Sequence, residues 1–134
     1  MAKPSGPTTQ RDPRGAPVQV RIGRVYDDIE SAGTYRVLVD RLWPRGVSRA
    51  TAPFDAWVKD LAPSGELRKW YSHDPEKFAE FARRYRAELE QEPARGALAE
   101  LRNQARSRDV VLLTATRDLR RSGAAVLMDV LGGR

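Results

Sequence analysis

Asp40, Arg41, Trp43 and Arg45 stand close together directly after a short apolar run, Val37–Val39. An arginine stays charged at cellular pH and presents a planar fork of donors. Two arginines beside an indole therefore suit a carboxylate, a phosphate or a stacked base, and the aspartate could act as a base. The alternative is that Asp40 and Arg41 form a buried structural ion pair that holds the end of a strand. The segment predicts a binding site but does not name a reaction.

The single histidine of the chain, His73, is the second candidate for chemistry. An imidazole ordinarily changes its charge near neutral pH, so His73 could serve as a general base oriented by Asp40 or Asp74. Alternatively, Asp74 caps a helix whose first residue is Pro75, and His73 only bonds a backbone carbonyl. In an enzyme, His73 and Asp40 would be the catalytic residues.

A second group of arginines, Arg117, Arg120 and Arg121, follows the last predicted strand. Cations are unfavourable at the start of a helix unless an anion is bound there, so this placement favours phosphate binding. Pairing with Asp118 or other carboxylates is the alternative. The predicted ligand-binding residues are therefore the four arginines and two tryptophans Arg41, Trp43, Arg45, Trp70, Arg117 and Arg121. Both indoles could stack on a ring or simply pack in the core.

The segments that must position these residues alternate between strands and helices. Strands are predicted over residues 18–26, 35–41, 54–61 and 109–114, the third with a short helix as the alternative. Helices are predicted after the caps Ser64 and Asp74, after Pro93, and from Leu119 or Ser122. This order predicts one layered α/β domain over residues 18–134, with a mainly parallel sheet flanked by helices and with 37–39 and 110–113 in interior strands. Ligands of such sheets gather at the carboxyl ends of the strands.

Composition limits the remaining classes. Twenty-four Lys and Arg residues against 18 Asp and Glu give a net charge of +6, which favours acidic partners, including nucleic acid. The absence of cysteine and the single histidine argue against thiolate and multi-histidine metal sites, so no metal or cofactor is expected. No apolar run is long enough to span a bilayer, so a cytoplasmic protein without a membrane partner is expected. Residues 1–17, rich in proline and glycine, are predicted to be a flexible tail.

Several segments resemble the bacterial domain-of-unknown-function family 488, especially its YeaO-like branch. Residues 24–27, 35–46, 62–64, 66–75 and 81–89 carry the resemblance, which extends over roughly residues 18–131. Its most specific elements are Trp-Pro-Arg-Gly at 43–46 and Trp-x-x-His-Asp-Pro at 70–75. The resemblance implies a small cytoplasmic α/β domain and brings no established general activity.

The chain departs from these relatives after its last predicted strand. They commonly read Leu-Leu-Tyr-Ala-Ala-Lys-Asp followed by Asn-His, or carry a cysteine near the strand end. This chain has Leu-Leu-Thr-Ala-Thr-Arg-Asp at residues 112–118, and Ser122-Gly123 stand in place of Asn-His. If that histidine serves chemistry in the relatives, the resemblance implies that the chemistry is lost or altered here.

The leading hypothesis is an arginine-rich site for an anionic small molecule, in an uncharacterised-family protein that could be an enzyme on a phosphorylated or carboxylated substrate. The alternative is a nucleic-acid-associated or regulatory binding module without catalysis. A third hypothesis is an inactive family member that serves a protein partner. The sequence leaves the substrate, the reaction and the oligomeric state open.

Overall fold

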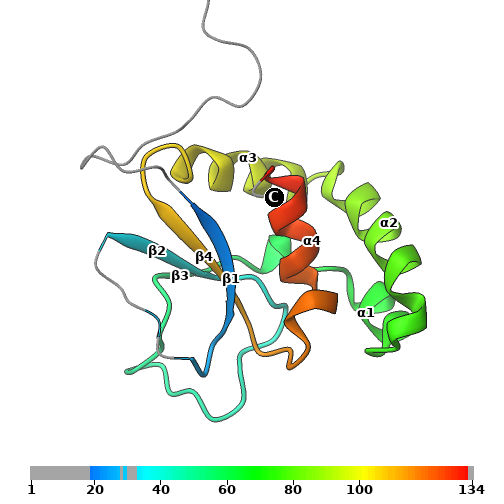
Figure 1. Ribbon diagram of the computed structural model, residues 1–134, viewed down its shortest axis with the longest axis horizontal. Helices are drawn as coiled ribbons and strands as arrows, with labels where there is room; N and C mark the ends of the chain where they lie inside the picture. Colours follow the sequence, from blue (N-terminus) through cyan, green and yellow to red (C-terminus); the bar gives the residue numbers. More distant parts are fainter. Residues whose placement is uncertain (1–18, 28, 30–32, 133–134) are drawn as a thin grey trace, which may run out of the picture.

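The computed structural model describes residues 19–27, 29 and 33–132 (Figure 1). A four-stranded sheet forms its centre, with the strand order β1-β4-β2-β3. All three pairings are parallel, which confirms the predicted α/β fold. The predicted tail, residues 1–17, lies outside the described residues. The strands are β1 (Val20–Arg24), β2 (Thr34–Leu38), β3 (Ala56–Trp57) and β4 (Asp109–Thr114).

The two interior strands are β2 and β4, as their uninterrupted apolar runs predict. Leu38 of β2 pairs with Leu113 of β4, and both side chains are fully buried. The ladder continues one residue beyond β2, because the Val39 N–H donates to the Leu113 carbonyl at 3.0 Å. The residue that follows, Asp40, is thereby held at the end of a buried strand.

Four helices complete the domain: α1 (Gly65–Tyr71), α2 (Phe78–Leu89), α3 (Ala94–Gln104) and α4 (Gly123–Val130). Both predicted caps are confirmed. The Ser64 hydroxyl accepts from the Leu67 N–H at 3.1 Å, and the Asp74 carboxylate accepts from the Glu76 N–H at 3.0 Å. Asp74 begins a 3₁₀ turn, Pro75–Lys77, that leads into α2. Among the described residues, no helix is both long enough and apolar enough to cross a membrane.

The third predicted strand, residues 54–61, is much shorter than expected. Only Ala56–Trp57 pair with β2, and a 3₁₀ turn follows at Lys59–Leu61. The Val58 N–H still donates to the Leu38 carbonyl, but the Ala62 N–H donates locally to Lys59. The turn places Leu61 in the main core, where it is fully buried, so tertiary packing overrides the alternating pattern.

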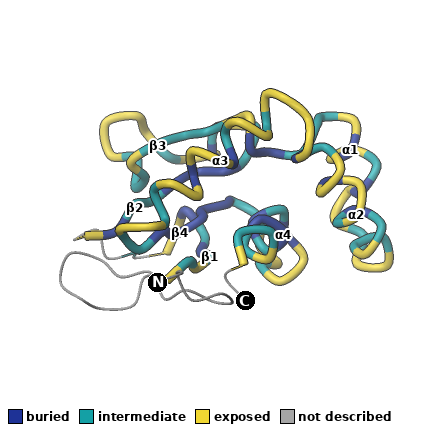
Figure 2. The backbone as a smooth tube through the Cα atoms, turned by 90° about the horizontal axis from the view of Figure 1, so that it is seen from above, coloured by how far each residue is buried: buried dark blue, intermediate teal, exposed yellow. Residues whose placement is uncertain are grey.

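The two faces of the sheet are covered differently. All four helices contribute to the apolar cluster that contains Val37, Val110 and Leu112 on one face. On the other face Leu38, Leu113 and their neighbours pack against Phe54 of the β2–β3 connection and Trp57 of β3. Figure 2 shows α1, α2 and α4 on the same side of the sheet. The edge where the strands end is therefore bordered by helices on one side and by the β2–β3 connection on the other.

Candidate functional site

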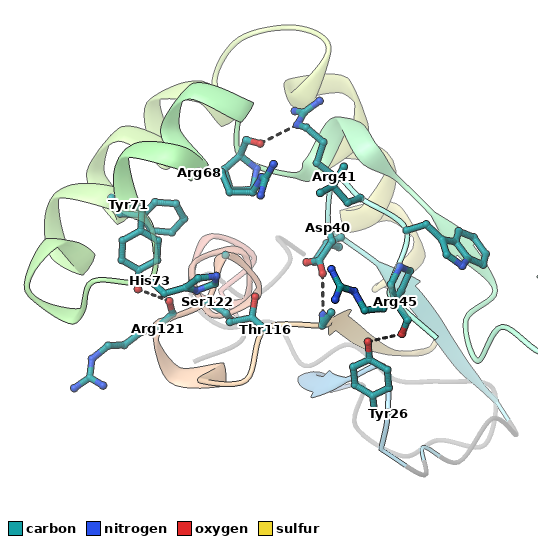
Figure 3. Close-up of a pocket in the computed structure, with 18 residues that line it drawn as sticks. Tyr26, Asp40, Arg41, Arg45, Arg68, Tyr71, His73, Thr116, Arg121 and Ser122 are labelled. Carbon is teal, nitrogen blue, oxygen red and sulfur yellow. Dashed lines mark hydrogen bonds between the residues drawn. The ribbon is translucent and has the colours of Figure 1, made fainter. Parts of the chain in front are cut away.

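A pocket of about 470 Å³ opens at the carboxyl ends of β1, β2 and β4 (Figure 3). The segment after β2, residues 40–45, forms one wall. Arg68 and Tyr71 of α1 form another, and Thr116 follows β4. The beginning of α4 also reaches the pocket through Gly123. This is the edge at which open α/β sheets usually hold their ligands.

Asp40 carries the carboxylate inside the pocket. One of its oxygens accepts from the Ala115 N–H at 2.8 Å and the other from the Thr114 hydroxyl at 2.7 Å. Burial raises the pKa of Asp40, although these two hydrogen bonds and the charges of Arg68 and His73 oppose the shift. Asp40 is thus fixed by β4 and holds its proton to a higher pH than an exposed aspartate does.

Arg41 does not form the ion pair with Asp40 that the sequence left open. Its Nε donates to the Pro63 carbonyl at 3.0 Å, and one Nη donates to the Ala62 carbonyl at 3.3 Å. These carbonyls lie just before α1, so the guanidinium fastens the entrance of α1 to the end of β2. Its charge nevertheless remains on the wall of the pocket.

Arg45 and Arg68 bring further positive charge to the same opening (Figure 3). Within the described part of the chain, neither side chain forms an ion pair with a carboxylate. The Arg45 carbonyl accepts from the Tyr26 hydroxyl at 2.8 Å, which ties the β2–β3 connection to the segment after β1. The two guanidinium groups are thus available for an anion.

His73 reaches the pocket from an unusual backbone conformation. Ser72 and His73 have φ values of 50° and 59°, in the left-handed region that residues with a side chain rarely adopt. Ser72 ends α1, and the pair turns the chain back toward the pocket before Asp74 caps the next turn. Local strain of this kind is often found at functional sites. Asp74 is occupied as the cap, and His73 shares the pocket with Asp40 without a hydrogen bond between the two side chains.

Arg121 lines the pocket, but its backbone carbonyl has a clearer role there than its guanidinium group. Its guanidinium points away from the other labelled side chains in Figure 3 and pairs with Asp118 at 3.0 Å, on the exposed surface. Its carbonyl accepts from the Tyr71 hydroxyl at 2.6 Å. The pairing with Asp118, which the sequence offered as an alternative, is the arrangement that the structure has. The bond from Tyr71 locks the start of α4 against α1.

Three other predicted ligand residues have different positions. Trp43 lines the pocket and donates its indole N–H to the Val47 carbonyl at 2.6 Å. Trp70 and Arg117 are not among the residues that line it. Trp70 packs against the main core, with Arg84 4.3 Å from its ring centroid, and Arg117 is exposed between β4 and α4. Sequence spacing alone does not predict which face of the short helix α1 carries the Trp70 indole. It also does not predict where the Arg117 guanidinium lies on a surface loop.

Sequence reasoning missed several residues of the pocket, notably Tyr26, Leu42, Arg68 and Tyr71. Arg68 and Tyr71 could have been found from sequence, because residues three apart on a helix lie on the same face and His73 comes two residues after Tyr71. No sequence pattern marks Tyr26 or Leu42 as pocket residues, because they reach the pocket only when the segments after β1 and β2 come together in the fold. No group of three or more metal-ligating side chains occurs within residues 19–27, 29 and 33–132.

Comparison with known proteins identifies the family. Over residues 19–134 the chain matches the family model described as the inactive DUF488-N3 subclade. The chain belongs to the DUF488 family. This confirms the family that the Trp-Pro-Arg-Gly and Trp-x-x-His-Asp-Pro motifs indicate.

Relatives in the family are similar over most of their length. An uncharacterised protein of Mycobacterium tuberculosis is 50% identical over 116 residues, which are 87% of this chain and 96% of the relative. The uncharacterised protein YeaO of Escherichia coli is 37% identical over 115 residues, 85% of this chain and 97% of the relative. No solved structure matches the chain.

Ser122 has a structural role in this DUF488 protein. Its side chain is buried at 1% exposure, accepts from the Ala125 N–H at 3.2 Å and donates to the Leu119 carbonyl at 2.7 Å. Ser122 is therefore the N-cap of α4. Among the described residues, the pocket offers one imidazole, that of His73, because the chain has a single histidine.

Proposed function

We propose that the protein binds a small molecule with a phosphate or carboxylate group in the pocket around Asp40. The observation that carries the proposal is the pair of guanidinium groups of Arg45 and Arg68, which line the pocket without an ion-pair partner among the described residues. Arg41 adds a third positive charge to the wall. Guanidinium groups bind carboxylate and phosphate oxygens through charge-assisted hydrogen bonds, often two at a time.

The proposed function is binding without turnover. The matching family model is described as inactive, and the motif resemblance implies that Ser122-Gly123 replace an Asn-His pair of relatives. Both oxygens of Asp40 already accept hydrogen bonds from β4 and the residue after it. An enzyme in which His73 exchanges a proton and Asp40 orients it is the alternative, and the location of both in one pocket favours it.

Titration calorimetry with inorganic phosphate and with citrate tests the proposal. We expect Arg45→Lys to weaken binding several-fold, because a bidentate fork becomes a point charge, and Arg68→Ala to weaken it by about tenfold. Arg95→Ala, an exposed arginine on α3 that does not line the pocket, is the matched control. Absence of binding by both anions, or equal losses in all three variants, would show that the pocket is not an anion site.

The enzyme alternative has a separate test. His73→Asn keeps the size and a polar group of the side chain but removes its ability to exchange a proton near neutral pH. We expect this variant to bind phosphate nearly as well as the unaltered protein. A turnover that His73→Asn abolishes, found in a screen of phosphate monoesters, would replace binding with catalysis as the function.

A further inference from the structure

Two exposed side chains give the pocket an apolar rim. Tyr26 and Leu42 are the large hydrophobic residues that are exposed in the described part of the chain, at 48% and 59%. Both line the pocket, together with Trp43 and the buried Pro44. One exposed leucine on a protein surface needs no explanation. Two exposed hydrophobic residues on one pocket form a surface that a ligand can cover.

The polar atoms of this rim are already engaged. The Tyr26 hydroxyl donates to the Arg45 carbonyl at 2.8 Å, and the Trp43 indole N–H donates to the Val47 carbonyl at 2.6 Å. Arg49 covers the Trp43 ring, with its guanidinium carbon 4.3 Å from the ring centroid. The rim therefore has no donor left on either ring. A ligand group rich in hydroxyls or ring nitrogens would lose hydrogen bonds to water there without replacing them.

The other part of the pocket is polar. In Figure 3, Arg68 and Thr116 lie on one side of Asp40 and Tyr26 lies on the other, with Arg45 beside Asp40. The site thus combines charged groups with a hydrocarbon surface within one opening of about 470 Å³. Pockets for small molecules commonly have this composition, with a few polar groups that fix the orientation of a mostly apolar ligand.

We propose that the ligand joins its phosphate or carboxylate to a plain hydrocarbon group, aryl or branched alkyl, which packs against Tyr26 and Leu42. This inference rests on the proposed anion-binding function and specifies the class of ligand. The anionic group contacts Arg45 and Arg68, and the hydrocarbon group covers the rim. A polar ester of similar size, such as a sugar or glycerol phosphate, gains only the first of these contacts.

Calorimetric titrations with inorganic phosphate, phenyl phosphate and glycerol phosphate test this inference. Covering part of a phenyl ring should make phenyl phosphate bind about tenfold more tightly than the other two. Leu42→Ser should remove most of that gain and leave the affinity for inorganic phosphate unchanged. Because Leu42 is exposed, this substitution leaves the core intact.

The outcomes separate the two proposals. If inorganic phosphate binds but phenyl phosphate binds no more tightly, or if Leu42→Ser leaves the gain in place, the apolar subsite is overturned and anion binding stands. If none of the three compounds binds, the anion site itself is overturned. Arg68→Ala should weaken phosphate and phenyl phosphate by the same factor, because it removes only the contact that they share.

Discussion

Asp40 is the residue on which the chemistry of the pocket depends most. It is a carboxylate placed among cationic side chains, and it could repel the anions that these side chains attract. Its hydrogen bonds from Ala115 and Thr114 stabilise the charged form, whereas burial favours the neutral form and raises the pKa. Since the folded protein holds this proton more tightly than the unfolded chain does, protonation of Asp40 favours folding. That contribution is fully present below the ordinary pKa of an aspartate and is lost as the pH rises through the raised value.

We expect sulfate to bind more tightly as the pH falls through the raised pKa of Asp40, because the carboxylate then loses the charge that repels the anion. Sulfate keeps its charge over this range, so calorimetry reports the protein groups alone. Asp40→Asn should bind sulfate more tightly than the unaltered protein at neutral pH and should show a flatter pH profile.

The comparison is repeated in a His73→Asn background, because His73 lines the same pocket as Asp40. In that background the remaining pH dependence should belong to Asp40. Identical pH profiles with aspartate and with asparagine at residue 40 would mean that a bound anion does not sense this carboxylate.

Several of the residues that surround Asp40 could be predicted from sequence, and others could not. Arg41, Arg45 and His73 line the pocket because they follow a buried strand and a short helix, both of which have clear signals. The signals that locate a strand or a helix do not predict the direction in which a long side chain points. Arg121 stands on the correct segment, yet its guanidinium pairs with Asp118, since an exposed arginine takes the carboxylate within its reach.

At the level of elements, the strands and caps with purely local causes were predictable. The apolar run of β4 and the caps Ser64 and Asp74 occur where the sequence predicts them. The length of β3 was not predictable. Its residues alternate as a strand, but their position beside the edge of the sheet and the burial of Leu61 decide the conformation.

Ser64 joins two elements that border the pocket. Its hydroxyl caps α1 and also donates to a carboxylate oxygen of Glu88 on α2, at 2.6 Å. The Ser64 N–H donates to the other oxygen of the same carboxylate at 2.8 Å. The entrance of α1, which Arg41 also fastens, is therefore tied to α2 by one side chain.

We expect Ser64→Ala to lower the free energy of unfolding by about 1–2 kcal/mol, because it removes a helix cap and leaves a carboxylate oxygen with one donor fewer. Urea denaturation measures the change. Ser107→Ala, an exposed serine in the turn before β4, is the matched control and should change stability by less than about 0.5 kcal/mol. Equal stability of the two variants would mean that neither contact of Ser64 contributes.

For the whole molecule, the net charge of +6 is what suggested a nucleic-acid partner. The described surface offsets part of this charge locally. On α2, Arg83 and Arg84 both pair with Glu80, and Arg86 pairs with Asp129. These carboxylates lower the potential that a row of arginines on one helix would otherwise present to a phosphate backbone.

We therefore expect duplex DNA to bind only at low salt, with no measurable binding near physiological salt. A protein that neutralises several phosphates releases several counterions, so its log–log salt slope is steep, on the order of 0.9 units per phosphate contacted. Fluorescence anisotropy of a labelled duplex, titrated between low and physiological salt, measures that slope, and we expect a value below about two. Glu80→Gln removes the ion-pair partner of Arg83 and Arg84 and should raise the affinity for DNA at low salt. Glu100→Gln on α3 is the control, because it changes the net charge by the same amount and Glu100 has no ion pair among the described residues. Binding that persists at physiological salt with a slope of several units would favour a nucleic-acid partner over the small anionic ligand.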